Sequence, residues 1–352
     1  MKILVLDMLY PRGHKSLSKA LIRLLSRFSD VFVVDYKNYY EGLTENDKIQ
    51  KINIDSQLFF SKGAPLIHMA SFYNLLLTKI KLQNINYDAI IFFSISNTSY
   101  YYARKIFKDT PVFVFHHNNI DKLTKKKEFR LFQKYMNTIN HIVFADFIKD
   151  GFESLTGINS NLVHVLNHPM DADIPNDLNN QIEPEKKCIK TFVGLGLSND
   201  EELIDQLILL DKKIDEEVDA KIILRSKEKK YSGKIVDIIS GYLENDEYNR
   251  LYKNSEGCLV CYPRTFNLRY SGTFMNAMIN KKVIISTDIS LARHFNYQYP
   301  NNCIVAKNAE HIIEIVKGFN RKFDMSEYAK FMNAHGDNKI SEDLYNLLKK
   351  KV

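Results

Sequence analysis

The sequence predicts an α/β protein built from two doubly wound, Rossmann-like domains that face each other across a cleft. Short apolar runs alternate with segments of helical periodicity, a polar stretch with prolines interrupts the alternation once, and the alternation then resumes. Alternating strands and helices are typical of a parallel sheet with helices on both faces. At 352 residues the chain also exceeds the length that one hydrophobic core usually serves.

The first half of the chain contains the elements of one such sheet. Apolar residues in its first predicted helix recur at helical spacing from Leu17 to Phe28, which marks a buried face. The runs between the helices are rich in Val, Ile and Phe and predict buried strands. The strands are expected over 2–6, 31–35, 88–94, 111–115, 141–145 and 162–166, and the helices over 15–28, 98–107 and 126–139.

The second half repeats this alternation. Strands are expected over 191–193, 221–224, 236–239, 257–262 and 283–286, and helices over 200–211, 247–253 and 309–319, with a further helical tail over 325–352. Ser198 to Glu201 matches a capping box for the helix that begins near 200. The domains are therefore expected at 1–167 and 188–319. A linker over 168–187 joins them, and C-terminal helices over 320–352 pack back on the first domain.

Composition indicates a folded protein without a membrane span. The chain is 45% hydrophobic and 26% charged, and no apolar run approaches the roughly 20 residues that cross a bilayer. Its beginning, from Met1 to Asp7, is typical of a first strand rather than a secretory signal. Cys258 and Cys261 lie in a predicted strand, where positions three apart face opposite sides, so a shared metal ion is not expected. These features favour reduced thiols and a cytoplasmic location.

The net charge of +7 comes mostly from lysine and suits an anionic ligand or an acidic membrane surface. No RNA-binding, zinc-finger or heptad pattern is present, so a nucleic-acid partner is not expected. Basic residues recur every four positions from Lys15 to Arg27, and again from Lys122 to Lys134. Each series is either a solvated helix face or a contact for anionic lipid, which leaves peripheral contact with the inner face of the plasma membrane open.

The loop that contains Arg264 and Arg269 leads into a predicted helix that begins at Ser271, Gly272 and Thr273. The first amides of a helix have no partner within it and attract anions, and arginine adds charge and a forked set of donors. This pattern predicts a site for a phosphate or diphosphate. The alternative is an ordinary capped helix with solvated arginines.

A glycine turn follows the first strand of the second half. Phe192 to Gly196 forms a strand followed by Gly-x-Gly, without the third glycine of a dinucleotide-binding loop. The pattern predicts a tight turn at the cleft, with Gly196 close to a ligand or serving turn geometry alone.

Two adjacent histidines, His116 and His117, end a buried strand of Val and Phe. Catalytic groups of α/β folds gather at such strand ends, and a histidine there can orient a sugar hydroxyl or act as a base. The alternative is a core or capping histidine that is satisfied by the backbone. Asp171 and Asp173 form an Asp-x-Asp pattern, but they fall in the predicted linker, so no metal site is assigned to them.

Several of these segments together resemble GT-B glycosyltransferases of the family-4 type. The segments 239–263, 271–278 and 282–288 resemble three consecutive parts of the family's second domain, and 111–116 and 162–167 resemble two strands of its first domain. The resemblance implies that the second domain binds a nucleotide-diphosphate sugar and that the first domain receives the acceptor. It also implies that His116 or His117 lines the sugar site.

The chain departs from the family pattern at two places. Family members usually carry two glutamates eight residues apart, where this chain has Leu268 and Asn276. The second glutamate holds the ribose of the nucleotide, so Asn276 is expected to hydrogen-bond there without the charge. The usual arginine and lysine are also missing from 195–205, which leaves Arg264, Arg269 and Arg225 as the candidates to bind the diphosphate.

The resemblance implies a hexosyltransferase that needs no cofactor or metal and retains the anomeric configuration. Its donor would be a nucleotide-diphosphate sugar, and its acceptor a saccharide or a lipid-linked glycan in bacterial surface-polysaccharide or glycoprotein-glycan synthesis. His116, His117 and Arg269 would act in catalysis. The donor would bind at Gly196, Arg225, Arg264, Ser271, Gly272, Thr273 and Asn276. The alternative is a non-catalytic GT-B-like subunit that binds or stabilises a partner glycosyltransferase. Such a subunit would be expected to lack the glutamates.

Overall fold

A computed structural model describes residues 1–7, 15–36, 38–44, 46–54, 64–82, 86–107, 109–117, 119–170, 189–196, 198–241 and 243–351. The chain forms two compact units. The first consists of Met1–Asp173, Leu268–Tyr270 and Asn333–Val352, and the second of Ile174–Asn267 and Ser271–Met332. Most of the predicted linker, 168–187, lies outside the described residues.

The first unit contains a parallel sheet of seven strands in the order β3-β2-β1-β4-β5-β6-β7. The order reverses direction after β3, as in a doubly wound fold. The strands are β1 (Lys2–Asp7), β2 (Asp30–Tyr36), β3 (Ile49–Ile54), β4 (Ala89–Ser94), β5 (Val112–Phe115), β6 (Asn140–Val143) and β7 (Val163–Val165). Their runs of Val, Ile and Phe are buried, as both faces of a parallel sheet require.

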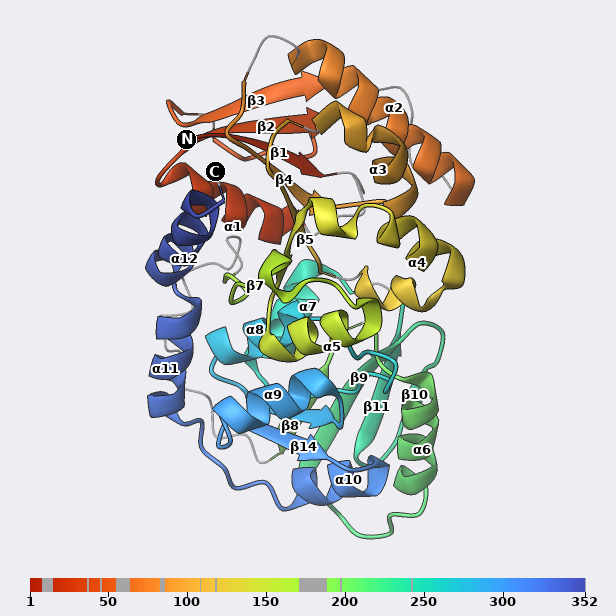
Figure 1. The fold of residues 1–352 in the computed structure, drawn as a ribbon. Coiled ribbons are helices and arrows are strands. Elements are labelled where there is room, and N and C mark those ends of the chain that lie inside the picture. Colours follow the sequence, from red (N-terminus) through yellow and green to blue (C-terminus); the bar gives the residue numbers. More distant parts are fainter. Residues whose placement is uncertain are drawn as a thin grey trace. The chain divides into compact units, whose positions relative to one another are not determined.

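Helices cover this sheet, and Figure 1 shows α1 next to α12, and α2 next to α3. Right-handed crossovers place the helix that follows β1 on one face of the sheet, and the helices that follow β3, β4, β5 and β6 on the other face. The helices are α1 (Lys15–Ser26), α2 (Ala64–Leu82), α3 (Asn97–Ala103) with η1 (Arg104–Phe107), η2 (Ile120–Thr124), α4 (Lys126–Gln133), η3 (Met136–Thr138), α5 (Asp146–Thr156), η4 (Ser160–Leu162) and α12 (Asp337–Lys349).

The second unit contains a sheet of seven strands in the order β10-β11-β9-β8-β12-β13-β14, parallel except for β10. The strands are β8 (Lys190–Gly194), β9 (Ala220–Ser226), β10 (Tyr231–Ser232), β11 (Val236–Ser240), β12 (Gly257–Val260), β13 (Val283–Thr287) and β14 (Cys303–Ala306). The helices are α6 (Glu201–Asp211), α7 (Asn245–Lys253), α8 (Gly272–Ile279), α9 (Ser290–Gln298) and α10 (Ala309–Lys317), followed by α11 (Met325–His335). Two parallel-dominated sheets with interleaved helices confirm the predicted fold class.

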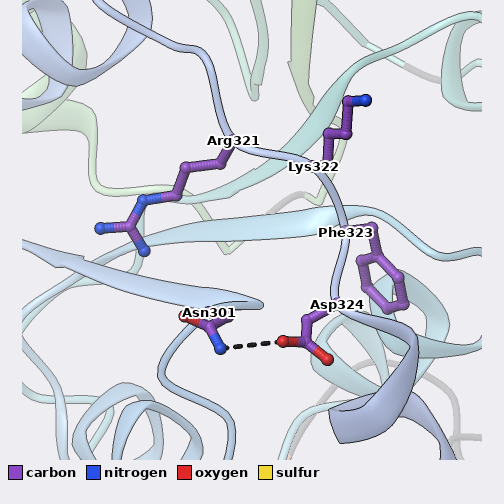
Figure 2. Close-up of a pocket in the computed structure, with 5 residues that line it drawn as sticks. All are labelled: Asn301, Arg321, Lys322, Phe323 and Asp324. Carbon is purple, nitrogen blue, oxygen red and sulfur yellow. Dashed lines mark hydrogen bonds between the residues drawn. The ribbon is translucent and has the colours of Figure 1, made fainter.

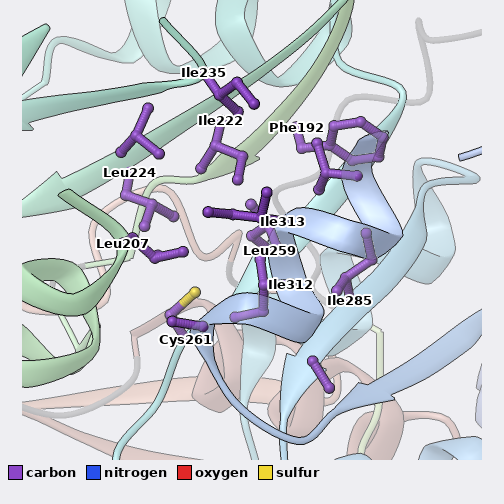
Figure 3. Close-up of a cluster of buried hydrophobic side chains, with 14 of the residues drawn as sticks. Phe192, Leu207, Ile222, Leu224, Ile235, Leu259, Cys261, Ile285, Ile312 and Ile313 are labelled. Carbon is purple, nitrogen blue, oxygen red and sulfur yellow. The ribbon is translucent and has the colours of Figure 1, made fainter. Parts of the chain in front are cut away.

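One apolar core cluster of the second unit lies between its sheet and the helices α6 and α10 (Figure 3). Phe192, Ile222 and Leu259 on the sheet pack with Leu207 on α6 and Ile312 on α10. Two glycines allow the strands to approach closely. A Cβ on Gly194 would lie 2.5 Å from Leu224 Cδ2 and 2.8 Å from the carbonyl oxygen of Leu259, and a Cβ on Gly257 would lie 2.8 Å from the carbonyl oxygen of Val283.

The structure differs from the sequence prediction in some elements. It adds β3, β10, β14, α2, α5 and α9 to the predicted ones. The predicted capping box is wrong, because Asp200 rather than Ser198 caps α6 and accepts from the amide of Glu202 at 3.1 Å. The Glu201 carboxylate instead accepts from Ser226 Oγ at 2.8 Å, at the end of β9. None of the helices within the described residues has the length and apolarity to cross a membrane.

Candidate functional site

The carboxyl ends of the parallel strands in the second unit are joined by polar side chains. Asn199 donates through Nδ2 to the carbonyl oxygens of Gly194 and Arg225, at 2.7 and 2.8 Å, and so connects the ends of β8 and β9. Thr287, at the end of β13, donates to the carbonyl oxygen of Tyr262 at 2.7 Å. Ligands of parallel α/β sheets bind at this edge. Hydrogen bonds that fix the strand ends relative to one another therefore suit a binding site here.

Helix α8 begins near this edge with the three residues that the sequence singles out. Ser271 is the N-cap residue, and its hydroxyl accepts from the amide of Thr273 at 3.2 Å. Gly272 is exposed, and a Cβ built on it would meet no atom within 4 Å. Because the first amides of a helix have no acceptor within it, the open space at Gly272 suits an anion.

Tyr262 fixes the start of α8. Its hydroxyl lies 3.0 Å from Ser271 Oγ and 2.9 Å from Thr273 Oγ1, and burial raises the pKa of this phenol. The phenol therefore stays protonated and ties both hydroxyls to the strand end that precedes Pro263. The sequence analysis missed Tyr262 as a site residue, although its place directly after a buried strand is a usable signal.

Two further predicted donor residues lie near these elements. Asn276 is half-buried and lies one turn after Gly272, so both residues share a face of α8. Gly196 follows β8, and a Cβ on it would lie 3.7 Å from Tyr262 Oη, an ordinary contact distance. Packing therefore does not require glycine at 196, in contrast to Gly194.

The arginines of the second unit have different surroundings. Arg225, at the end of β9, is buried, and its Nε donates to the carbonyl oxygen of Gly241 at 2.6 Å. Arg264 is exposed in a turn after Pro263. The pKa of Asp288 is lowered mainly by its hydrogen bond from Arg293, and the charge of Arg264 lowers it further. Arg264 thus lies in a polar, solvent-accessible loop, where an anion can reach it.

The segment Leu268–Tyr270 belongs to the first unit. Arg269 forms an ion pair through Nε with Asp121 in η2. Leu268 lies against Gly151 of α5 so closely that a Cβ on the glycine would collide with it. The position where the family has its first glutamate is therefore occupied by an apolar side chain packed on a helix, and Arg269 already has a carboxylate partner.

His116 lies at the end of β5 and is buried, with its ring directed into the first unit. His141 Nε2 lies 2.8 Å from the carbonyl oxygen of Met136, which can only accept, so this nitrogen is the donor. His141 Nδ1 then accepts from His116 Nε2 at 2.7 Å. His116 Nδ1 is left with a lone pair, and the structure places Asn119 Oδ1 3.0 Å from it. Two acceptors do not bond, so neutral rings require the Asn119 amide to be turned with its NH₂ group toward His116.

Both rings of this buried pair are neutral. Burial lowers the pKa of His116 to about 4, and burial lowers the pKa of His141 well below its usual value. Because both ring nitrogens of His116 are engaged inside the unit, the geometry suits a structural role better than contact with a sugar.

His117 is half-buried and takes part in a group of aromatic rings. Its ring centroid lies 5.8 Å from that of Phe144 and 5.8 Å from that of His168. His168 in turn stacks on Tyr270, with the centroids 4.9 Å apart and the planes at 13°. Of the two predicted histidines, only His117 is not fully buried, although its Nδ1 atom is.

A separate pocket of about 460 Å³ lies in the second unit (Figure 2). It is lined by Asn301, Arg321, Lys322, Phe323 and Asp324, with Asn301 Nδ2 donating to Asp324 at 2.9 Å. Asn301 precedes β14, so the pocket lies at the amino edge of the parallel sheet, away from the strand ends that hold the predicted donor site. The Asp171 and Asp173 pair lies outside the described residues.

No protein-family model matches the sequence, and no curated protein matches it by sequence. Solved glycosyltransferase structures nevertheless share its fold over nearly the whole chain. HepE from Anabaena, in complex with UDP and glucose, is 16% identical, and the match covers 99% of this chain and 100% of HepE with a TM-score of 0.67.

Two further structures are similar to the same extent. A glycosyltransferase from Rickettsia africae is 14% identical, with 99% of this chain and 97% of the other covered and a TM-score of 0.64. Sucrose-phosphate synthase from Thermosynechococcus elongatus is 10% identical, with 99% and 98% covered and a TM-score of 0.69. The predicted GT-B fold is confirmed.

Proposed function

We propose that this GT-B-fold chain is a glycosyltransferase that moves a sugar from a nucleotide-diphosphate sugar to a saccharide or a lipid-linked glycan. The structurally similar HepE has been solved with UDP and with UDP-glucose, which supports a uridine nucleotide as the first donor to test. The fold alone does not choose a reaction. The observation that carries the proposal is the start of α8, where a helix N-terminus with open space at Gly272 lies at the carboxyl edge of the second sheet.

The diphosphate would bind at the amide of Gly272 and beside Thr273, whose own amide donates to Ser271 Oγ, with Ser271 and Tyr262 holding the turn. A leaving diphosphate develops negative charge, and helix amides with nearby guanidinium groups stabilise such charge. Arg264 is the first candidate because its side chain is exposed. Arg225 and Arg269 are further candidates, but each already binds a protein acceptor. In this proposal the arginines replace a metal ion, and the reaction retains the anomeric configuration.

Asn276 would reach the ribose, one turn beyond the amides, and Gly196 would lie beside the donor at the neighbouring strand end. In the first unit we assign the acceptor or the transferred sugar to His117 rather than His116, because His117 is partly accessible. We further propose a cytoplasmic enzyme of surface-polysaccharide or glycoprotein-glycan synthesis with peripheral membrane contact.

A second function is favoured by one observation. Leu268 packs against Gly151 at the position where the resemblance places a glutamate, which favours a non-catalytic subunit that binds a nucleotide and stabilises a partner enzyme. Both functions predict nucleotide binding, and only the first predicts turnover.

The experiment that tests the proposal is a thermal-shift and calorimetric titration of the whole chain with UDP, GDP, ADP and their sugar conjugates. A ligand present at about 100 times its Kd raises the free energy of unfolding by about 2.7 kcal/mol. We expect one nucleoside diphosphate to do so. If none binds, donors with any of these three bases are excluded, and with them the proposed uridine nucleotide.

The variant Gly272→Ala locates the binding. Its added methyl group meets no protein atom within 4 Å, so we expect the melting temperature without ligand to stay unchanged. The methyl group would occupy the space proposed for the diphosphate, so we expect nucleotide affinity to fall by about tenfold or more. Unchanged nucleotide affinity would mean that the donor does not bind at the start of α8. Product formation with a panel of acceptors then separates the enzyme from the non-catalytic subunit.

A further inference from the structure

Helix α2 has an exposed apolar stripe, which we define as Met69, Tyr73, Leu76 and Ile80. These side chains are 67%, 43%, 37% and 64% exposed. Their spacing of four, three and four residues places them along one face of the helix. A water-soluble surface helix normally turns such a face toward the core, so the stripe requires an explanation.

The opposite face of α2 is buried and carries polar residues. Asn74 and Thr78 are 4% and 0% exposed. The Tyr36 hydroxyl lies 2.9 Å from Thr78 Oγ1, and Thr78 Oγ1 donates to the carbonyl oxygen of Asn74 at 2.8 Å. Rolling the helix to bury the stripe would break these hydrogen bonds in the interior, which is costly. The outward direction of the stripe is therefore built into the fold.

The charged residues of α2 and of β3, α3 and η1 beside it are all basic. The helix itself, the elements β3 and α3 that pack against it, and η1 after α3 contain no aspartate or glutamate. The same elements carry five basic residues: Lys51, Lys79, Lys81, Arg104 and Lys105. Helix α4, which packs against α3, adds the exposed Lys126 and Arg130 and one acid, Glu128, which accepts from Asn97 Nδ2 at 3.0 Å. The basic residues still outnumber the acidic one.

The first basic series predicted from the sequence is less suited to a surface contact. Arg27, just after α1, binds Asp337 of α12 through Nη2 at 2.6 Å, and Lys15 at the start of α1 lies over the ring of Tyr39. The basic surface beside α2 and α4 is more accessible, and it is accompanied by apolar side chains.

We propose that the apolar stripe of α2 docks the protein onto a membrane surface that contains anionic lipid. Apolar side chains on one helix face with lysines at its flanks are the chemistry of interfacial helices, which lie in the headgroup region without crossing the bilayer. The positive charge around the stripe complements anionic headgroups. This proposal concerns a surface remote from the start of α8 in the sequence and does not depend on donor binding.

The first test is flotation of the whole chain with phosphatidylcholine vesicles that contain a minor share of phosphatidylglycerol. We expect the chain to float, and the double variant Met69→Ser with Ile80→Ser to bind at least about tenfold more weakly. The matched control is Leu209→Ser with Tyr297→Ser in the second unit, where the side chains are 58% and 89% exposed. The control variant is expected to float like the unchanged chain.

The chain contains no tryptophan, so one introduced tryptophan reports its own surroundings. In Tyr73→Trp we expect the emission to shift to shorter wavelength when anionic vesicles are added, and to be quenched by brominated lipid. In Tyr297→Trp we expect neither change. On vesicles of phosphatidylcholine alone we expect binding to be weaker by about tenfold or more, because each basic residue near an anionic surface adds to the attraction.

Three outcomes would overturn the proposal. One is flotation of the Met69→Ser, Ile80→Ser variant equal to that of the unchanged chain. Another is an unshifted Tyr73→Trp spectrum with saturating anionic vesicles. The third is a dimer in analytical ultracentrifugation that this double variant dissociates while the unchanged chain fails to float, which would assign the stripe to a second copy of the chain. Nucleotide titration of the same variants reports separately on the proposed function.

Discussion

His116 and His141 share a hydrogen bond in the interior of the first unit, and both are held neutral there. The pKa of His116 is about 4 in the folded protein, below the usual histidine value of 6.5. The lowered pKa means that the folded protein favours neutral His116. The stability that His116 contributes is therefore present above about pH 6.5 and is lost as the pH falls toward 4. Between pH 7 and pH 5 this loss amounts to about 2 kcal/mol for one such histidine.

The variant His116→Gln removes the titration while keeping a side chain that can donate and accept. We expect it to be less stable at pH 7, and to lose about 2 kcal/mol less than the unchanged chain between pH 7 and pH 5. Urea unfolding at the two pH values measures this difference. An equal loss in both proteins would mean that His116 does not titrate in this range.

At the residue scale the sequence could predict the local features of the site. Ser271 is the N-cap of α8 because a short hydroxyl side chain precedes the helix, which is visible in the chain itself. The partner of Arg269 was not predictable, because Asp121 lies 148 positions away in the chain. The inward direction of His116 depends on His141, which belongs to another strand. Neighbouring residues on an extended strand end face opposite sides, so the pattern itself allowed only one of the two histidines to be accessible.

At the scale of elements, Gly194 and Gly196 at the end of β8 differ in how closely other atoms pack against them. We expect Gly194→Ala to destabilise the protein by about 1–3 kcal/mol, because the new Cβ would lie 2.8 Å from the backbone oxygen of Leu259. Gly196→Ala is the matched control. Its Cβ meets Tyr262 Oη at 3.7 Å, so we expect stability to remain within about 0.5 kcal/mol.

Chemical unfolding of both variants checks this prediction, and nucleotide titration of Gly196→Ala adds a test of its proposed place beside the donor. Equal stability of the two variants would show that β8 and β12 can move apart at little cost. Weaker nucleotide binding by Gly196→Ala at unchanged stability would support a ligand contact.

Two of the helices that the sequence analysis missed, α2 and α5, share a physical cause. Helix α2 carries polar Ser71, Asn74 and Thr78 on its buried face and large apolar residues on its exposed face, so the usual rule for a helix pattern does not apply. Helix α5 contains Gly151 in its interior, which lowers helix propensity, and it needs that glycine for the contact with Leu268. In both helices a tertiary contact decides the residue, and local periodicity does not report it.

At the scale of the whole molecule, the first unit is assembled from three separate parts of the chain. Helix α12 belongs to it and packs on α1, where Ser341 Oγ donates to the carbonyl oxygen of Leu24 at 3.1 Å and Tyr345 meets Phe28 edge to face. Ile340, Leu344 and Leu348 of this helix are fully buried. The helix is thus part of the core of the first unit rather than an appendage.

We expect Ile340→Ala to lower the free energy of unfolding of the first unit by about 2–5 kcal/mol, because it leaves a cavity in the core. The control is Lys339→Ala, whose side chain is 52% exposed and paired with Asp343, and which should change stability by less than about 0.5 kcal/mol. Calorimetry of both variants checks the prediction. A variant Ile340→Ala as stable as the control would mean that α12 contributes little to the unit.

The division of the first unit along the chain has a consequence for biosynthesis. Residues 333–352 leave the ribosome only after every residue of the second unit has been translated. Phe28, just after α1, is made early, and it lacks its aromatic partner until Tyr345 emerges. Nascent chains are therefore expected to expose apolar surface of α1 throughout translation of the second unit and to offer it to holding chaperones. The portion that is translated first is the one that matures last.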